Sequence, residues 1–205
     1  MLRRKKPRDL NVPGRDAKGV HFAVDYLTSV TKSLLDSGFA DGKAINAAGK
    51  KCAGHRRRRH RQTTVRALLC GRASTDLMAL EMMPQPPVER TAANPWPEWP
   101  RVLKVDYGQT ECIAKFGKDP RVYQTTVKEF LKDEAGNLTG AVISCLKPER
   151  DPETGRTSMV PTGEEFTYNC QLAFIAAGFT GCENYTADAF GVELTARGNV
   201  SRPQL

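Results

Sequence analysis

Several features that mark whole classes of protein are missing from these 205 residues. No run approaches the roughly 20 apolar residues that a membrane-spanning helix needs. No apolar core follows the basic start at residues 1–6, so a secretory signal is not expected. The six cysteines form no CxxC pair, which favours reduced thiols over a disulfide framework or a metal site. We therefore expect a cytoplasmic protein with no membrane partner and no metal.

Acidic residues are also missing, but from one stretch only. Between Gly42 and Thr75 there are ten basic residues and no acidic one, although the whole chain carries a net charge of only +8. The positive charge therefore belongs to one segment. A nucleic-acid-binding protein that uses the basic cluster at 55–61 is an alternative interpretation. No aromatic residue is interleaved with that cluster, so nucleic acid is not an expected partner.

The apolar residues that are present predict an α/β domain. Helical spacing predicts a helix over 20–37 that stops at Gly38. A second helix is predicted over 119–131, with Asp119 as its N-cap and Pro120 at its first position. Apolar runs between turn residues predict strands at 76–83, 102–105, 138–146, 156–161 and 165–177, the last ending as a central strand. Apolar residues in the arginine-rich segment 52–72 follow neither the two-residue spacing of a strand nor the 3.6-residue spacing of a helix. We expect a loop or a frayed helix there.

Three stretches carry motifs that occur in one order in a known family. The first joins Pro7-Arg8-Asp9-Leu10 to Pro13-Gly14-Arg15-Asp16; the second joins Met82-Met83-Pro84-Gln85-Pro86-Pro87, Asn94-Pro95-Trp96-Pro97-Glu98-Trp99-Pro100, Asp106-Tyr107-Gly108 and Asp119-Pro120-Arg121-Val122-Tyr123; the third joins Phe174-Ile175-Ala176-Ala177-Gly178-Phe179-Thr180-Gly181, Gly191-Val192-Glu193-Leu194 and Arg197-Gly198-Asn199-Val200. The series resembles the small (beta) subunit of glutamate synthase, an NADPH-dependent family of FAD/NAD(P)-binding oxidoreductases. The resemblance covers most of 7–51 and 74–200.

The resemblance implies a Rossmann-like FAD/NAD(P)-binding domain with a small β-meander, incomplete in this chain. Residues 1–19 would be the end of an FAD-domain segment and the crossover from it. Residues 20–180 would be the NAD(P)H-binding domain, with 52–73 an aberrant arginine-rich part. Residues 181–205 would be a truncated return segment toward the FAD domain.

The family's small subunit passes a hydride from NADPH to FAD, and its electrons go on to the large subunit for glutamate synthesis. The resemblance therefore implies NADPH and FAD as cofactors and the large subunit as partner. The residues implied to line the nicotinamide cleft are Ala177, Gly178, Phe179 and Thr180. None is a catalytic acid or base, because hydride transfer between two cofactors needs none.

The glycine turn that holds the dinucleotide phosphates in this family is absent. Such a turn lets the pyrophosphate approach bare backbone N–H groups, yet residues 54–61 read Gly-His-Arg-Arg-Arg-Arg-His-Arg. No GxGxxG motif for FAD occurs either. We therefore expect a fragment that binds neither cofactor tightly and is inactive alone.

A frameshift in the coding DNA would account for the missing turn. One permitted set of codons for residues 54–61, read from its second base, encodes Val-Ile-Gly-Gly-Gly-Asp-Thr-Gly. We hypothesise that the frame is shifted between about residues 52 and 73 and is restored by Ser74 or Thr75. This would also confine the basic residues to one stretch.

Two further features, a tryptophan-containing loop and a histidine, have interpretations apart from the family resemblance. The loop with Trp96 and Trp99 could belong to a partner-binding module, and the sequence leaves that alternative open. His21 lies at the start of the first predicted helix, and we interpret it as a structural histidine.

Overall fold

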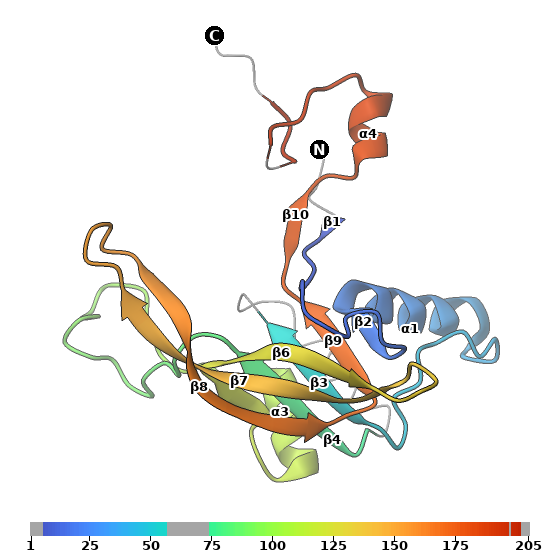
Figure 1. The fold of residues 1–205 in the computed structure, drawn as a ribbon, viewed down its shortest axis with the longest axis horizontal. Coiled ribbons are helices and arrows are strands. Elements are labelled where there is room, and N and C mark those ends of the chain that lie inside the picture. The colour runs from blue at the N-terminus through green and yellow to red at the C-terminus, as the bar shows by residue number, and fades with distance from the viewer. Residues whose placement is uncertain (1–5, 57–73, 197, 202–205) are drawn as a thin grey trace.

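A five-stranded parallel sheet lies at the centre of the computed structural model, which describes residues 6–56, 74–196 and 198–201 (Figure 1). Its strands, in spatial order, are β2 (Val20–Phe22), β9 (Leu172–Ala176), β3 (Lys51–Arg56), β4 (Asp76–Glu81) and β5 (Arg121–Tyr123). All neighbouring pairs are parallel. The sheet is covered on both faces, as parallel sheets usually are.

Helices α1 (Ala23–Ser37) and α3 (Tyr107–Phe116) contribute to the core on one face. The ring of Tyr26 from α1 lies 4.6 Å from that of Phe174 in β9. Cys52 of β3 and Leu77 of β4 are in register, so their side chains point to the same face of the sheet. Helix α1 ends where Gly38 adopts a left-handed conformation with φ of 58°.

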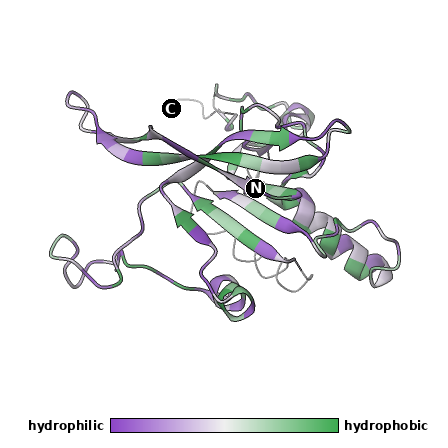
Figure 2. Cartoon of the chain, turned by 60° about the horizontal axis from the view of Figure 1, so that its bottom comes forward, coloured by the Kyte–Doolittle hydropathy of each residue, from purple (hydrophilic) through white to green (hydrophobic). Residues whose placement is uncertain are grey.

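An antiparallel sheet covers the other face. Its strands are β6 (Thr125–Lys132), β7 (Leu138–Arg150) and β8 (Thr157–Asn169), joined in that order. Phe130 and Ile143 pack here against Ala53 and Ile175 of the parallel sheet. The β7–β8 hairpin continues past the core, and its tip is hydrophilic (Figure 2). The core therefore has three layers: helices, parallel sheet and meander.

A short ribbon leads away from these layers (Figure 1). Strand β1 (Lys6–Pro7) pairs antiparallel with β10 (Phe179–Gly181), and α4 (Asn184–Ala189) follows. None of the helices in the described residues is long and apolar enough to cross a membrane. The five cysteines in the described part of the chain form no disulfide with one another.

The structure confirms the α/β fold class and most of the predicted strands. Strand β4 lies within the predicted 76–83. Strands β7 and β8 correspond to the predicted strands at 138–146 and 156–161 and pair as a hairpin. The predicted strand at 165–177 is divided: residues 165–169 belong to β8, and β9 is interior in the parallel sheet, with β2 on one side and β3 on the other. The small meander implied by the family resemblance is the β6–β8 sheet.

Four predictions of local structure are wrong. The predicted helix over 119–131 is instead β5 and β6. Val127 and Phe130 have helical spacing, but both side chains face the core because the register of β6 shifts between Val127 and Glu129. The predicted strand at 102–105 is a loop. Residues 20–22 are strand β2, so the first helix begins later than predicted. Helix α3 was not predicted at all.

A further error concerns the arginine-rich segment. Residues 52–56, expected in a loop or frayed helix, belong to β3, which is paired on both sides. Pairing with β4 and β9 imposes the extended conformation although the residues themselves have no strand pattern. The remainder of the segment, 57–72, lies outside the described residues, as does most of the hypothesised frameshift.

Candidate functional site

The carboxyl ends of the five parallel strands meet at one edge of the sheet. Arg56, the last residue of β3, is in register with Glu81 of β4 on one side and with Ala176 of β9 on the other. Glu81 is in turn in register with Tyr123 of β5. In open α/β sheets, ligands bind outside such an edge.

The side on which successive strands are added to the sheet changes beside β3. Strands β4 and β5 follow it in sequence on one side, whereas β9 lies on its other side and is reached only after the antiparallel sheet. A crevice opens at the point where two successive connections leave a sheet in opposite directions. The interval between β3 and β9 is therefore the expected ligand position.

The four residues implied to line a nicotinamide cleft follow β9 directly. Ala177 is buried, and Gly178 turns the chain with φ of 85°, a conformation that favours glycine. The carbonyl of Gly178 accepts the backbone N–H of Arg8 at 2.8 Å. The Thr180 hydroxyl donates to the carbonyl of Lys6 at 3.4 Å. The structure thus keeps these residues together as the crossing from the sheet to the β1–β10 ribbon.

Two hollows adjoin this crossing, and Phe179 lines both. The smaller, about 80 Å³, is bounded by α1, β9 and Gly178. It is far below the roughly 300 Å³ at which small-molecule pockets begin. The larger, about 790 Å³, lies along the ribbon and contains Thr180 with the cations Lys6 and Arg8. Among the described residues, Gly178 and Phe179 line the smaller hollow, and Phe179 and Thr180 line the larger one. That all four residues line a nicotinamide cleft stays a prediction.

Glu81 was missed by the sequence reasoning. It is partly buried at the carboxyl end of β4, directly beside the end of β3. In dinucleotide-binding sheets, an acidic residue at this place hydrogen-bonds a ribose hydroxyl. Its signal in the sequence was its place as the last residue of an apolar run ending before Pro84.

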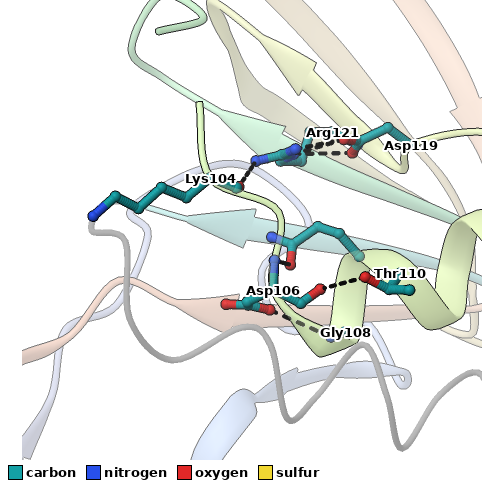
Figure 3. A network of polar contacts seen from close by, with 7 residues as sticks. Lys104, Asp106, Gly108, Thr110, Asp119 and Arg121 are labelled. Carbon is teal, nitrogen blue, oxygen red and sulfur yellow. Dashed lines mark hydrogen bonds and ion pairs between the residues drawn. The ribbon is translucent and has the colours of Figure 1, made fainter. Parts of the chain in front are cut away.

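Asp119 does not cap a helix but holds Arg121 (Figure 3). Its carboxylate accepts from Arg121 Nε at 2.9 Å and Nη2 at 2.5 Å. Arg121 Nη1 also donates to the carbonyl of Lys104 at 3.0 Å. Burial alone lowers the pKa of Arg121, but the hydrogen bonds and charge of Asp119 outweigh it, so the pKa is raised. The pair is a structural anchor.

The sequence after β3 lacks the glycines that hold a dinucleotide's phosphates in the family. Gly54 is buried inside the strand, and the next residues in sequence are His55 and four arginines. His55 is only 4% exposed, and its Nε2 lies 3.2 Å from Thr126 Oγ1 of β6. A phosphate grip needs bare backbone N–H groups at the strand exit, and no glycine is available there. His55 is also too buried to belong to a nucleic-acid surface, while 57–61 lie outside the described residues.

His21 takes the structural place expected of it, although in β2 rather than at the start of a helix. It is in register with Phe174, and the two rings stack with centroids 6.3 Å apart. Burial lowers the pKa of His21, and this effect outweighs the opposing charge of Asp25.

Three comparisons place the chain among known proteins. It is 40% identical to the glutamate synthase [NADH] of Schizosaccharomyces pombe, over 96% of this chain and 9% of that protein. It is 38% identical to the glutamate synthase [NADPH] small chain of Bacillus subtilis, over 92% of this chain and 38% of that one. The chain thus spans well under half the length of these relatives. No family model matches it.

The fold itself recurs in a solved structure. FprA of Mycobacterium tuberculosis in complex with NADPH superposes with a TM-score of 0.58, over 98% of this chain and 53% of that one, at 14% identity. At this identity the likeness shows the fold alone. The sequence relatives show that this chain is similar to one segment of the glutamate synthase small chain.

Proposed function

We propose that this chain is the nicotinamide-dinucleotide-domain segment of a glutamate synthase small chain, and that with its present sequence it does not hold the dinucleotide tightly. The observation that carries the first part is the parallel-sheet edge with the change of side beside β3, in a chain 38% identical to such a small chain. The observation that carries the second is the arginine sequence at the exit of β3.

The activity proposed for the whole protein is transfer of a hydride from NADPH to FAD, with the electrons passing to the large chain for glutamate synthesis. The dinucleotide, when bound, supplies that hydride. This chain's own contribution is the sheet edge and the Ala177–Thr180 crossing. We also propose that residues 1–19 end an FAD-domain segment, that 20–180 form the NAD(P)H-binding domain and that 181–205 return toward the FAD domain. The ribbon that leads away from the sheet supports this division (Figure 1). We further propose a cytoplasmic setting.

The test restores the glycine turn. In one variant, residues 54–61 are replaced by Val-Ile-Gly-Gly-Gly-Asp-Thr-Gly; in a matched control, Arg57, Arg58 and Arg59 become alanine, which removes charge without supplying glycine. Calorimetric titration with NADPH and NADH should show no micromolar binding for the chain or the control. The restored variant should gain it, because backbone N–H groups become accessible to the phosphates.

Two results would contradict this proposal. Micromolar binding by the unaltered chain would show that arginine side chains can replace the glycine turn. A restored variant that folds, by circular dichroism, but binds neither dinucleotide would show that the edge is not a dinucleotide site.

A further inference from the structure

The longest connection in the described structure presents two indoles to solvent. Residues 84–105, here called the tryptophan loop, join β4 to α3 outside both hydrophobic cores. Trp96 is 81% exposed and Trp99 is 77% exposed. Loops longer than roughly 12–15 residues without secondary structure usually carry a function or are disordered, so the internal contacts of this loop decide between the two.

Arg90 and Asn94 hold the tip of the loop in one shape. Arg90 Nη1 donates to three backbone carbonyls, those of Asn94, Pro95 and Glu98, at 3.4, 3.3 and 2.8 Å. Asn94 is buried; its Nδ2 donates to a Glu98 carboxylate oxygen at 3.0 Å and to the Trp99 carbonyl at 3.1 Å. The backbone that carries the indoles is therefore fixed while the indoles themselves are not covered.

The base of the loop is closed as well. The N–H of Leu103 donates to the carbonyl of Pro87 at 2.7 Å. Arg121, held by Asp119, donates to the carbonyl of Lys104 at 3.0 Å (Figure 3). The loop is thus an ordered projection anchored to β5.

An ordered loop with exposed tryptophans has the properties of a binding element. Tryptophan is enriched among residues that dominate binding energy, and a preformed loop loses little conformational entropy on binding. Lys104, whose Nζ lies 4.4 Å from the centre of the Trp99 ring, adds positive charge beside the indoles. The exposed Arg101 is already paired with Glu98 at 3.6 Å. A complementary surface would be apolar with carboxylates around it.

We propose that the tryptophan loop docks into an apolar pocket with a carboxylate rim on the large chain of a glutamate synthase. This inference rests on the proposed function. The relatives support this occupant: the matching segment is 38% of a separate small chain in one and 9% of a much longer polypeptide in another. In both settings most of the enzyme lies outside the segment, and an element that projects from the fold is positioned to meet it.

The two tryptophans are the only ones in the chain, which makes the loop directly observable. Fluorotryptophan incorporated into the full chain gives one fluorine NMR resonance for each indole. We expect both resonances to show a large solvent isotope shift between light and heavy water in the free chain. Addition of unlabelled large chain from the same organism should move both resonances and reduce that shift, because the indoles leave water.

Variants assign the binding energy. The double substitution Trp96→Ala with Trp99→Ala should raise the dissociation constant for the large chain at least about thirtyfold. The control Phe190→Ala removes an equally exposed aromatic side chain beyond α4, and should change it less than about twofold. Lys104→Glu, which leaves the indoles in place, should weaken binding most at low salt.

Three outcomes would overturn the inference. Binding of the large chain with unchanged indole resonances would place the interface elsewhere, and no binding at all would remove the partner. Resonances that move with the concentration of the chain alone would show that a second copy covers the loop. The dinucleotide titration described above is independent of all three, so failure here is distinguishable from failure of the proposed function.

Discussion

Strands β3 and β9 are hydrogen-bonded neighbours, yet they fill the core very differently. Strand β9 contributes the large apolar side chains of Leu172, Phe174 and Ile175 to the core, whereas β3 contributes the small Cys52 and Ala53 and the polar His55. Both are strands, because extended conformation at the centre of a sheet is imposed by pairing on both sides. Most of the buried apolar side chains of this pair thus belong to β9, whereas β3 is held extended by its pairing with β4 and β9.

The two strands also leave the edge differently. Strand β9 ends in a turn whose Gly178 has a positive φ, while β3 ends at Arg56 with further arginines after it in the sequence. A sheet can therefore retain its fold while one of its exits loses the residues that bind a ligand. Fold and phosphate binding depend on different residues of the same edge.

The largest expected effect tests the packing of β9. Phe174→Ala should lower the free energy of unfolding by about 3–5 kcal/mol, the usual cost of removing a buried phenyl ring. The ring is fully buried between Tyr26 and the sheet. Chemical denaturation measures the change. A loss below about 1 kcal/mol would mean that β9 does not carry the core.

The exit of β9 comes next. Gly178→Ala should cost about 1–2 kcal/mol, because an L-residue is strained at positive φ. An added Cβ would meet no atom within 4 Å, so the cost comes from the backbone alone. Gly178→Asn should cost less, since asparagine tolerates this conformation better. Equal losses for the two variants, again by denaturation, would contradict a backbone origin.

A smaller effect is expected in β3. Cys52→Ala should lower the free energy of unfolding by about 1 kcal/mol, because only one small buried group is removed. Cys52 is fully buried, and so is Phe174 of β9, which pairs with Gly54, two residues after Cys52. If Cys52→Ala cost as much as Phe174→Ala, the contrast between the two strands would be wrong.

Much of the sheet could be predicted from sequence, and β3 shows where that ends. Strands β4 and β9 have long apolar runs, so their burial was readable. Strand β3 reads Lys-Cys-Ala-Gly-His-Arg, which has no strand rhythm, and its conformation depends on β4 and β9. Such a tertiary cause is not visible in a local pattern.

Helix α3 was missed although its signal was present. The Asp106 side chain accepts from the backbone of Gln109, and the Gln109 side chain accepts the N–H of Asp106 at 3.2 Å; this reciprocal pair is a capping box. Asp106 also accepts the N–H of Gly108 at 3.3 Å. Asp119 before Pro120 imitated a helix start more visibly, but its carboxylate pairs with Arg121 instead. A local start signal competes with side-chain partners that the sequence does not show.

The candidate site was only partly readable. Ala177–Thr180 were named through the family resemblance, and the structure keeps them adjacent to β9. Glu81 was missed because its importance depends on the end of β4 lying beside the end of β3. A register of this kind follows from the topology of the sheet and not from either strand alone.

The smallest expected effect concerns pH at the β2–β9 pair. Burial lowers the pKa of His21 below its ordinary 6.5; Asp25 opposes the shift, while Arg15 and Lys50 add to it. The folded chain thus favours neutral His21, so its contribution to stability is present above pH 6.5 and is lost as pH falls through the lowered pKa. The chain should therefore lose stability on acidification more steeply than His21→Gln, which cannot be protonated.

Denaturation at a series of pH values measures that difference. The other ionisable groups are common to both proteins and cancel in the comparison. Parallel profiles would mean that protonated His21 is accommodated beside Phe174 at no cost. That result would remove His21 from the groups that couple β2 to β9, and would leave the contacts of Phe174 with α1 as the main support of that side of the sheet.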